Sequence, residues 1–240
     1  MRNLSKTSKQ FSPRYNKGPI IAIDGPAASG KSTAAYLVAK NLGYLYLDTG
    51  AMYRALTWKA LRDKVDMGDE KALSQLAKES KISFTHYPEG GVKIYLDGEE
   101  VTFLIRSPEV DKYVSIVSKI KEVRKSLVAQ QRQMGRNGGI VAEGRDIGTV
   151  VFPGAEVKIY LTASFEERVR RRWEERKQKG LSLEKEKVKN ELITRDRIDT
   201  HRQMSPLRKA KGAVVIDNTY LSIDETVRKI LEVVKEKLVV

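Results

Sequence analysis

The sequence predicts an α/β protein with an open parallel sheet flanked by helices, and three observations support this. From residue 20 onward, short aliphatic or β-branched runs alternate with longer amphipathic segments, which is typical of parallel strands joined by helices. A glycine-rich turn joins the first apolar run to the first helical segment. The chain of 240 residues is long enough to bury one sizeable core.

Five segments are predicted as strands because they are short and rich in aliphatic and β-branched residues. They cover residues 20–23, 44–47, 139–143, 157–163 and 213–218. Amphipathic segments around them are predicted as helices at about residues 31–42, 50–64, 108–119, 121–135, 164–179, 183–201 and 222–238. Residues 81–101 break this rhythm with two alternating runs around Gly90-Gly91 and a turn at Asp97-Gly98. We predict a small antiparallel hairpin or meander there.

Composition narrows the class of partner. Lys and Arg number 45 against 31 Asp and Glu, and the net charge of +14 favours phosphorylated partners, either nucleotides or nucleic acid. Cysteine is absent, which excludes disulfides and thiolate sites and fits a reducing cytoplasm. No apolar run has the length of a membrane span. Residues 1–17 are basic and lack the apolar middle of a secretion signal; we interpret them as a flexible tail, with a nucleic-acid arm as the alternative.

The turn after the first strand carries a specific motif. Residues 25–32, GPAASGKS, match G-x-x-x-x-G-K-[ST] between a predicted strand and a predicted helix. Small residues let a polyphosphate approach the backbone, where successive N–H groups and the helix N-terminus face the anion. Lys31 is expected to reach the β- and γ-phosphates, and the Ser32 hydroxyl to ligate Mg²⁺. The alternative is a glycine-rich turn without a ligand, but strand, spacing, lysine, hydroxyl and helix all agree with a nucleoside triphosphate.

An acidic residue that orders Mg²⁺ is usually sought at the end of a neighbouring apolar strand. Glu143 ends the predicted strand 139–143 and is the candidate for holding the hydration shell of the metal. An ion pair with an arginine explains a strand-end carboxylate equally well.

Polar and cationic residues also gather where predicted strands end, which is where open α/β sheets bind ligands. After the second and third strands come Asp48, Thr49, Tyr53, Arg54, Arg145 and Asp146. Helical spacing places two further sets on single helix faces, namely Arg168 with Arg171 and Arg172, and Arg195 with Asp199 and Arg202. Each helical set alone also fits a solvated face with ion pairs. Their occurrence beside a triphosphate motif favours a second anionic substrate.

In chain order, the segments IDGPAASGKST, LDTGAMYRA, VAEGRDIGTVVFP, VKIYLTAS and RDRIDTHRQMSPL resemble the bacterial cytidylate kinases, a family of nucleoside monophosphate kinases. The resemblance runs from about residue 19 to the C-terminus. It implies a P-loop NTPase fold with a five-stranded parallel sheet, a small antiparallel β insert and a mobile lid. The implied domain spans residues 18–240, with a monophosphate-binding insert at about 64–122 and a lid at about 164–180.

The activity implied by the resemblance is transfer of the ATP γ-phosphoryl group to CMP or dCMP with Mg²⁺, in pyrimidine nucleotide metabolism and in a monomer. The matching segment for ATP phosphates and Mg²⁺ comprises Gly25, Pro26, Ala27, Ala28, Ser29, Gly30, Lys31, Ser32 and Thr33. The implied catalytic charges are those of Lys31, Arg145, Arg168 and Arg172, the last two being lid arginines.

The resemblance also implies how the acceptor is held. Arg54, Arg145 and Arg202 match arginines around the CMP phosphate. Two further residues line the same pocket, Thr49 and Tyr53, and Thr49 departs from the serine common in the family.

For the rest of the acceptor, Arg195 and Asp199 match residues that hold the sugar. The residues that match those reading the base are Ser115, Arg124 and Asp146.

Such a transfer needs no general base, because the acceptor is already an anionic phosphate oxygen. This agrees with a chain whose two histidines, His86 and His201, lie in no nucleophile–base pattern. One alternative is a P-loop kinase for another acceptor, such as UMP, AMP or a non-nucleotide metabolite. A second is an ATP-dependent nucleic-acid-binding protein. Against the second, no apolar strand ends in Asp-Glu and aromatic residues make up only 7%, without a basic–aromatic patch.

Overall fold

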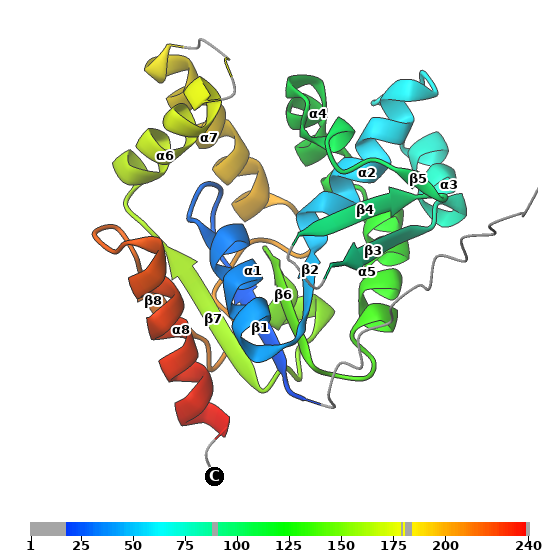
Figure 1. Ribbon diagram of the computed structural model, residues 1–240. Coiled ribbons are helices and arrows are strands. Elements are labelled where there is room, and N and C mark those ends of the chain that lie inside the picture. The colour runs from blue at the N-terminus through cyan, green and yellow to red at the C-terminus, as the bar shows by residue number, and fades with distance from the viewer. Residues whose placement is uncertain (1–17, 88–90, 179, 181–183, 239–240) are drawn as a thin grey trace, which may run out of the picture.

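A five-stranded parallel sheet forms the centre of the protein (Figure 1). The computed structural model describes residues 18–87, 91–178, 180 and 184–238. The strand order is β2-β6-β1-β7-β8, with β1 Ile20–Asp24, β2 Leu45–Asp48, β6 Ile140–Gly144, β7 Val157–Thr162 and β8 Val214–Asp217. This confirms the predicted parallel sheet and all five predicted strands. The predicted tail at residues 1–17 lies outside the described residues.

Helices cover both faces of the sheet, and the alternation of side chains along β1 shows why. Ile21 and Ile23 pack with α1 (Lys31–Leu42) and α8 (Ile223–Leu238), whereas Ala22 packs with α2 (Thr49–Arg62) and α5 (Lys121–Met134). A strand buried on both sides needs apolar residues at every position, which explains its continuous apolar run. The sheet therefore divides the expected single core into two large apolar clusters.

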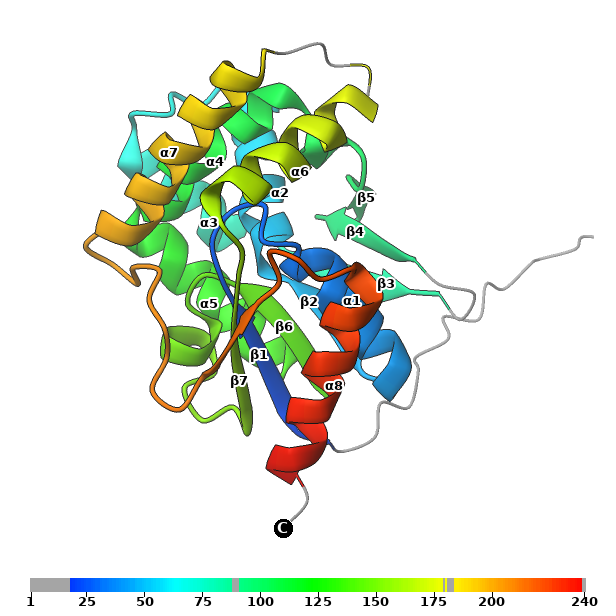
Figure 2. The same ribbon diagram turned by 90° about the vertical axis from the view of Figure 1, so that its left-hand side faces the viewer.

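Two helical layers rise above the carboxyl ends of the strands (Figures 1 and 2). One consists of α6 (Phe165–Gln178) and α7 (Lys185–His201), which meet the glycine-rich turn through Val169, Val188, Leu192 and Ala27. The other includes α4 (Pro108–Lys119), which packs on α2. The seven predicted helices are thus confirmed within the described residues, and the two layers stand on opposite sides of the strand ends.

The antiparallel insert is a three-stranded meander of β3 (Ile82–His86), β4 (Val92–Leu96) and β5 (Glu99–Glu100). Before it lies a helix that the sequence prediction omitted, α3 (Glu70–Glu79). The Asp69 carboxylate caps this helix by accepting from the amides of Lys71 and Ala72, and its buried face packs on α5. The Asp69 cap and the helical spacing of Leu73, Leu76 and Ala77 were signals in the sequence from which this helix could have been predicted. A 3₁₀ turn, η1 (Leu104–Arg106), also went unpredicted.

A π-helical turn, η2 (Ile147–Val151), follows β6 and is anchored by a buried carboxylate. Asp24, at the end of β1, accepts hydrogen bonds from the amides of Ile147 at 2.7 Å and Gly148 at 2.8 Å. Burial raises the pKa of Asp24 to about 6, although both backbone bonds lower it. The anchor fixes the turn immediately after Arg145 and Asp146. Among the described residues, no helix is both long and apolar enough to cross a membrane.

Replacing Asp24 by Asn tests this anchor. The pKa of Asp24 in the folded protein, about 6, lies above its usual value of 3.8. The contribution of Asp24 to the free energy of unfolding is therefore full below pH 3.8 and is lost as the pH rises through about 6. Between pH 5 and pH 8, the free energy of unfolding of the wild type should fall by about 1 kcal/mol more than that of Asp24→Asn. Urea denaturation of both proteins at the two pH values measures the difference. Parallel pH profiles would contradict the assignment.

Candidate active site

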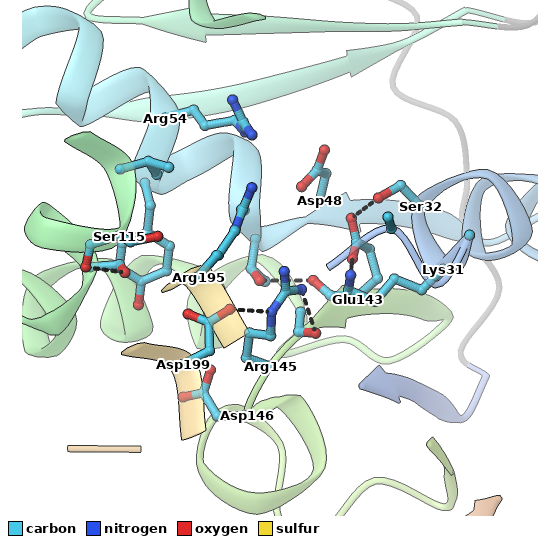
Figure 3. A pocket seen from close by; sticks show the side chains of 18 of the residues that line it. Lys31, Ser32, Asp48, Arg54, Ser115, Glu143, Arg145, Asp146, Arg195 and Asp199 are labelled. Carbon is cyan, nitrogen blue, oxygen red and sulfur yellow. Dashed lines mark hydrogen bonds and ion pairs between the residues drawn. The ribbon is translucent and has the colours of Figure 1, made fainter. Parts of the chain in front are cut away.

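A cavity of about 300 Å³ opens at the carboxyl ends of β2 and β6 and beside the N-terminus of α1 (Figure 3). Side chains from α2, α4, α5, α6 and α7 complete its wall. The predicted site residues that line it are Ala28, Gly30, Lys31, Ser32, Thr33, Thr49, Tyr53, Arg54, Ser115, Arg124, Glu143, Arg145, Asp146, Arg172, Arg195, Asp199 and Arg202. Segments far apart in the sequence are thus brought to one place.

Five predicted residues do not line this cavity: Gly25, Pro26, Ala27, Ser29 and Arg168. Four of them belong to the glycine-rich turn but are buried away from the cavity. The fifth, Arg168, is buried beneath that turn, where its Nη1 donates to the carbonyl of Ala27 at 3.1 Å and to Asp196 at 2.6 Å. In this structure Arg168 therefore joins α6 to α7 and the turn, whereas Arg172, one helical turn further on, reaches the cavity.

The glycine-rich turn is held close to the sheet. A Cβ added at Gly25 would lie 2.0 Å from the carbonyl oxygen of Leu161, so no side chain fits there. At the other end of the turn, Gly30 has a φ of 83°, a left-handed conformation that favours glycine. Lys31 follows at the start of α1, and its Nζ donates to the carbonyl of Pro26 at 3.2 Å. The lysine is thus folded back over the turn at the helix N-terminus, where an anion binds favourably.

Lys31, Ser32 and Glu143 form the acidic and basic centre of the cavity (Figure 3). The Ser32 hydroxyl donates to Glu143 Oε1 at 2.6 Å, and Lys31 Nζ lies 3.9 Å from Glu143 Oε2. Burial lowers the pKa of Lys31 to about 7, with Arg145 acting in the same direction. Burial likewise raises the pKa of Glu143 to about 7, helped by the charge of Asp48. Burial disfavours the charged form of both groups, and a ligand of opposite charge would stabilise that form.

The same centre offers oxygen ligands to a metal ion but cannot enclose one by itself. Among the described residues, no cluster of three or more His, Asp or Glu side chains could hold one alone. The Ser32 hydroxyl and the Glu143 carboxylate nevertheless place two oxygen ligands side by side, and oxygen is what Mg²⁺ prefers. Mg²⁺ commonly takes only one or two protein ligands together with substrate phosphates. The residues therefore fit a magnesium ion that arrives with a nucleotide.

Buried ion pairs line the opposite part of the cavity. Arg145 Nε donates to Asp199 Oδ2 at 2.8 Å, and Arg124 Nη2 donates to Asp146 Oδ2 at 2.5 Å. The Arg124 guanidinium also lies 5.1 Å from the ring centre of Tyr53. These pairs hold donors and acceptors in fixed positions in the cavity wall, where Arg124, Asp146 and Asp199 are buried.

Two further arginines are only partly matched by acids. Arg202 lies near Asp146 and Asp199 at 3.7 and 4.0 Å. Burial lowers the pKa of Arg195 to about 10, and the neighbouring charges of Arg145 and Arg54 act in the same direction (Figure 3). Such closely spaced cations favour an anionic ligand.

The structure adds residues that the sequence prediction gave no role. Asp48 caps α2 by accepting from the amide of Ala51 at 2.8 Å, and also accepts from Arg106 Nη2 at 3.0 Å. Its place before Thr49 was the signal that could have identified it. Asp111 on α4 contacts two site arginines, and nothing in its sequence context indicated this.

Asn218, another residue without a predicted role, lies under the glycine-rich turn. The amide of Asn218 donates to the carbonyl of Ser29 at 3.0 Å and its oxygen accepts from Arg171 Nη1 at 3.0 Å. Asn218 thereby joins the loop after β8 to both the turn and α6.

The cavity combines a glycine-rich turn at a helix N-terminus with a group of buried arginines, and comparison with known proteins shows the family. A family model described as "Cytidylate kinase" matches residues 21–236. The chain belongs to the cytidylate kinase family. Among its relatives, the cytidylate kinase of Bacillus velezensis is 52% identical over 217 residues, covering 90% of this chain and 96% of the relative. That of Bacillus subtilis is 50% identical over 217 residues, with the same coverage. The resemblance inferred from the motifs is thereby confirmed.

Gly25→Ala tests how tightly the turn of this family member is held. The new methyl would overlap the Leu161 carbonyl, so the turn must shift. We expect the free energy of unfolding to fall by about 2–3 kcal/mol, and the free energy of ATP binding to weaken by a similar amount. Gly154→Ala is the matched control, because a Cβ there meets nothing within 4 Å. Thermal denaturation and ATP titration compare the two variants. Equal behaviour would show that the turn is not constrained by β7.

Proposed function

We propose that this member of the cytidylate kinase family transfers the γ-phosphoryl group of ATP to CMP or dCMP, giving ADP and CDP or dCDP. The observation that supports this most strongly is the convergence, in one cavity, of a triphosphate-binding turn and a separate group of paired arginines.

On the donor side, the turn from Gly25 to Thr33 would hold the phosphates of ATP, with Lys31 facing the β- and γ-phosphates. Ser32 and, through water, Glu143 would hold Mg²⁺, which when bound neutralises phosphate charge. The proximity of the Ser32 hydroxyl to Glu143 supports this assignment. Binding a polyphosphate beside Lys31 would also restore the lysine's full positive charge, because a neighbouring anion raises its lowered pKa.

On the acceptor side, Arg54, Arg145 and Arg202 would surround the monophosphate. Because the phosphate oxygen that attacks is already anionic, the protein needs to align the two nucleotides and offset their repulsion rather than remove a proton. The incompletely neutralised charge of Arg195 and its neighbours supports this role. Thr49 and Tyr53 would shape the same pocket, with the Thr49 hydroxyl held by the carbonyl of Glu143 at 2.8 Å.

The rest of the acceptor would be read by polar side chains that line the same cavity. Arg195 and Asp199 would hold the sugar. Ser115, Arg124 and Asp146 would read the base, since a carboxylate can accept from the cytosine N4 amine and a guanidinium can donate to N3 and O2. The buried Arg124–Asp146 pair supports this, because it fixes one donor and one acceptor side by side.

Closure of a lid at about residues 164–180 would protect the transfer from water. Arg172 already lines the cavity, whereas Arg168 would have to leave the Ala27 carbonyl to reach a phosphate. Residues 64–122 would form the monophosphate-binding insert. We further propose that the enzyme is a monomer that acts in cytoplasmic pyrimidine nucleotide metabolism without binding nucleic acid.

Base selectivity gives the sharpest test of this function. CMP should be preferred over UMP by about 10⁴ in kcat/KM, because UMP would place an acceptor against Asp146 and a donor against Arg124. Asp146→Asn should narrow this ratio chiefly by lowering CMP turnover. ADP release measured with CMP, dCMP, UMP and AMP gives the ratios.

The matched control is Asp196→Asn, whose carboxylate pairs with Arg168 outside the cavity. It should leave the CMP:UMP ratio unchanged. If Asp146→Asn lowers kcat/KM for CMP and UMP equally, Asp146 only orders its loop. If the wild type prefers AMP or UMP, CMP is not the acceptor.

Lys31→Ala should remove most phosphoryl transfer, by about 10²-fold or more, while CMP binding stays nearly intact. The lysine faces the triphosphate turn rather than the acceptor arginines. Lys40→Ala, an exposed lysine in the last turn of the same helix, serves as the control. Calorimetric titration with CMP and turnover assays separate the two effects. An equal loss of CMP affinity would place Lys31 at the acceptor.

A further inference from the structure

Asp111, on α4, bridges two arginines that approach the cavity from different layers of the protein. Its Oδ1 accepts from Arg54 Nη2 at 2.5 Å, and its Oδ2 accepts from Arg172 Nη2 at 2.7 Å. Arg54 comes from α2 on the insert side, and Arg172 comes from α6 on the opposite side (Figures 1 and 2). One carboxylate therefore joins the two layers.

The electrostatic surroundings of Asp111 keep it ionised. Burial acts to raise its pKa, but the charges of Arg54, Arg172 and Arg195 lower it to about 2. Its side chain is 18% exposed, as is that of Arg172, so solvent screens the contact only in part. Charge-assisted hydrogen bonds of this kind are among the stronger polar contacts in proteins.

The bridge also fixes the orientation of Arg54. The two terminal nitrogens of this guanidinium are both used, Nη1 by the carbonyl of Ile105 at 3.4 Å and Nη2 by Asp111. Arg54 and Arg172 repel one another, so they approach a common point only if an anion lies between them. In the ligand-free protein Asp111 is that anion.

Glu175 provides a natural comparison within the same helix as Arg172. Its Oε2 accepts from Arg172 Nη1 at 2.8 Å, so Arg172 is held by two carboxylates. In the described contacts of Arg54, however, the carboxylate partner is Asp111. Asp111 and Glu175 therefore share Arg172, and Asp111 in addition contacts Arg54.

We propose that Asp111 is a positioning residue that holds Arg54 of the acceptor pocket and Arg172 of α6 at one point of the cavity, and so links acceptor binding to the position of α6. The inference rests on the proposed function for its kinetic consequences but not for the bridge itself. Asp111 positions both cations before substrate arrives, which reduces the ordering needed when the acceptor phosphate binds.

The kinetic test compares three variants. Asp111→Asn should raise the KM for CMP about tenfold, while the KM for ATP changes less than about twofold, because Lys31 and the triphosphate turn are untouched. Asp111→Glu, which keeps the carboxylate, should restore part of the loss. Glu175→Gln, which removes the other carboxylate partner of Arg172, should raise the KM for CMP less than Asp111→Asn does.

The structural test requires no activity. Because the chain has no cysteine, Glu109→Cys on α4 and Lys177→Cys on α6 give two exposed sites that can be spin-labelled selectively. Without nucleotide, the distance distribution between the labels should be narrow in the otherwise wild-type protein. It should broaden in Asp111→Asn and stay narrow in Glu175→Gln.

Different results of these two tests would contradict the proposed function, the bridge and the positioning role. If the wild type does not phosphorylate CMP but the label distribution broadens in Asp111→Asn, the proposed function is refuted and the bridge stands. Unchanged label distances in Asp111→Asn would overturn the bridge. An unchanged or lowered KM for CMP in that variant would overturn the positioning role, a lowered value meaning that the carboxylate competes with the acceptor phosphate.

Discussion

The need to keep closely packed cations stable before any phosphate arrives shapes this site. A buried charge without a partner is costly, and Lys31, Arg124 and Arg145 are all removed from solvent. Each is met by a carboxylate that would repel a phosphate, namely Glu143, Asp146 or Asp199. The acids are therefore necessary parts of an anion site, because they hold the cations in place until the nucleotide replaces part of their charge.

The order of strands determines which of these charges can meet. Because β6 lies between β1 and β2, Glu143 aligns with Ile23 on one side and with Asp48 on the other. All three strands are parallel, so their carboxyl ends open on the same edge as the triphosphate turn. Asp24 then fixes the turn after β6 through two backbone hydrogen bonds. In this way Arg145 and Asp146 are positioned by the sheet rather than by the ligand.

Local patterns were sufficient to predict much of this arrangement. The strands have continuous apolar runs, and the GPAASGKS turn has the spacing and the strand–helix context of an anion-binding turn. The family motifs then indicated most of the residues that line the cavity. Glu143, for which metal binding and an ion pair with an arginine were equally open, accepts from Ser32 and pairs at 3.9 Å with Lys31 rather than with an arginine.

What the sequence could not predict depends on pairing between distant side chains. Arg168 and Arg172 share one face of α6, yet Arg168 is captured by Asp196 and the Ala27 carbonyl, whereas Arg172 meets Asp111 across the cavity. Helical spacing specifies a common face but not the acceptor at the end of a long side chain. The role of Asp111 depends on how α4 and α6 pack, which no spacing along the chain reveals.

A crystal structure of the protein with CMP bound would test the account most directly. The account predicts the phosphate of CMP on Arg54, Arg145 and Arg202, and the cytosine N4 amine within hydrogen-bond distance of Asp146. A phosphate bound elsewhere, or a base that leaves Asp146 uncontacted, would contradict the conclusion that these paired charges form the acceptor site.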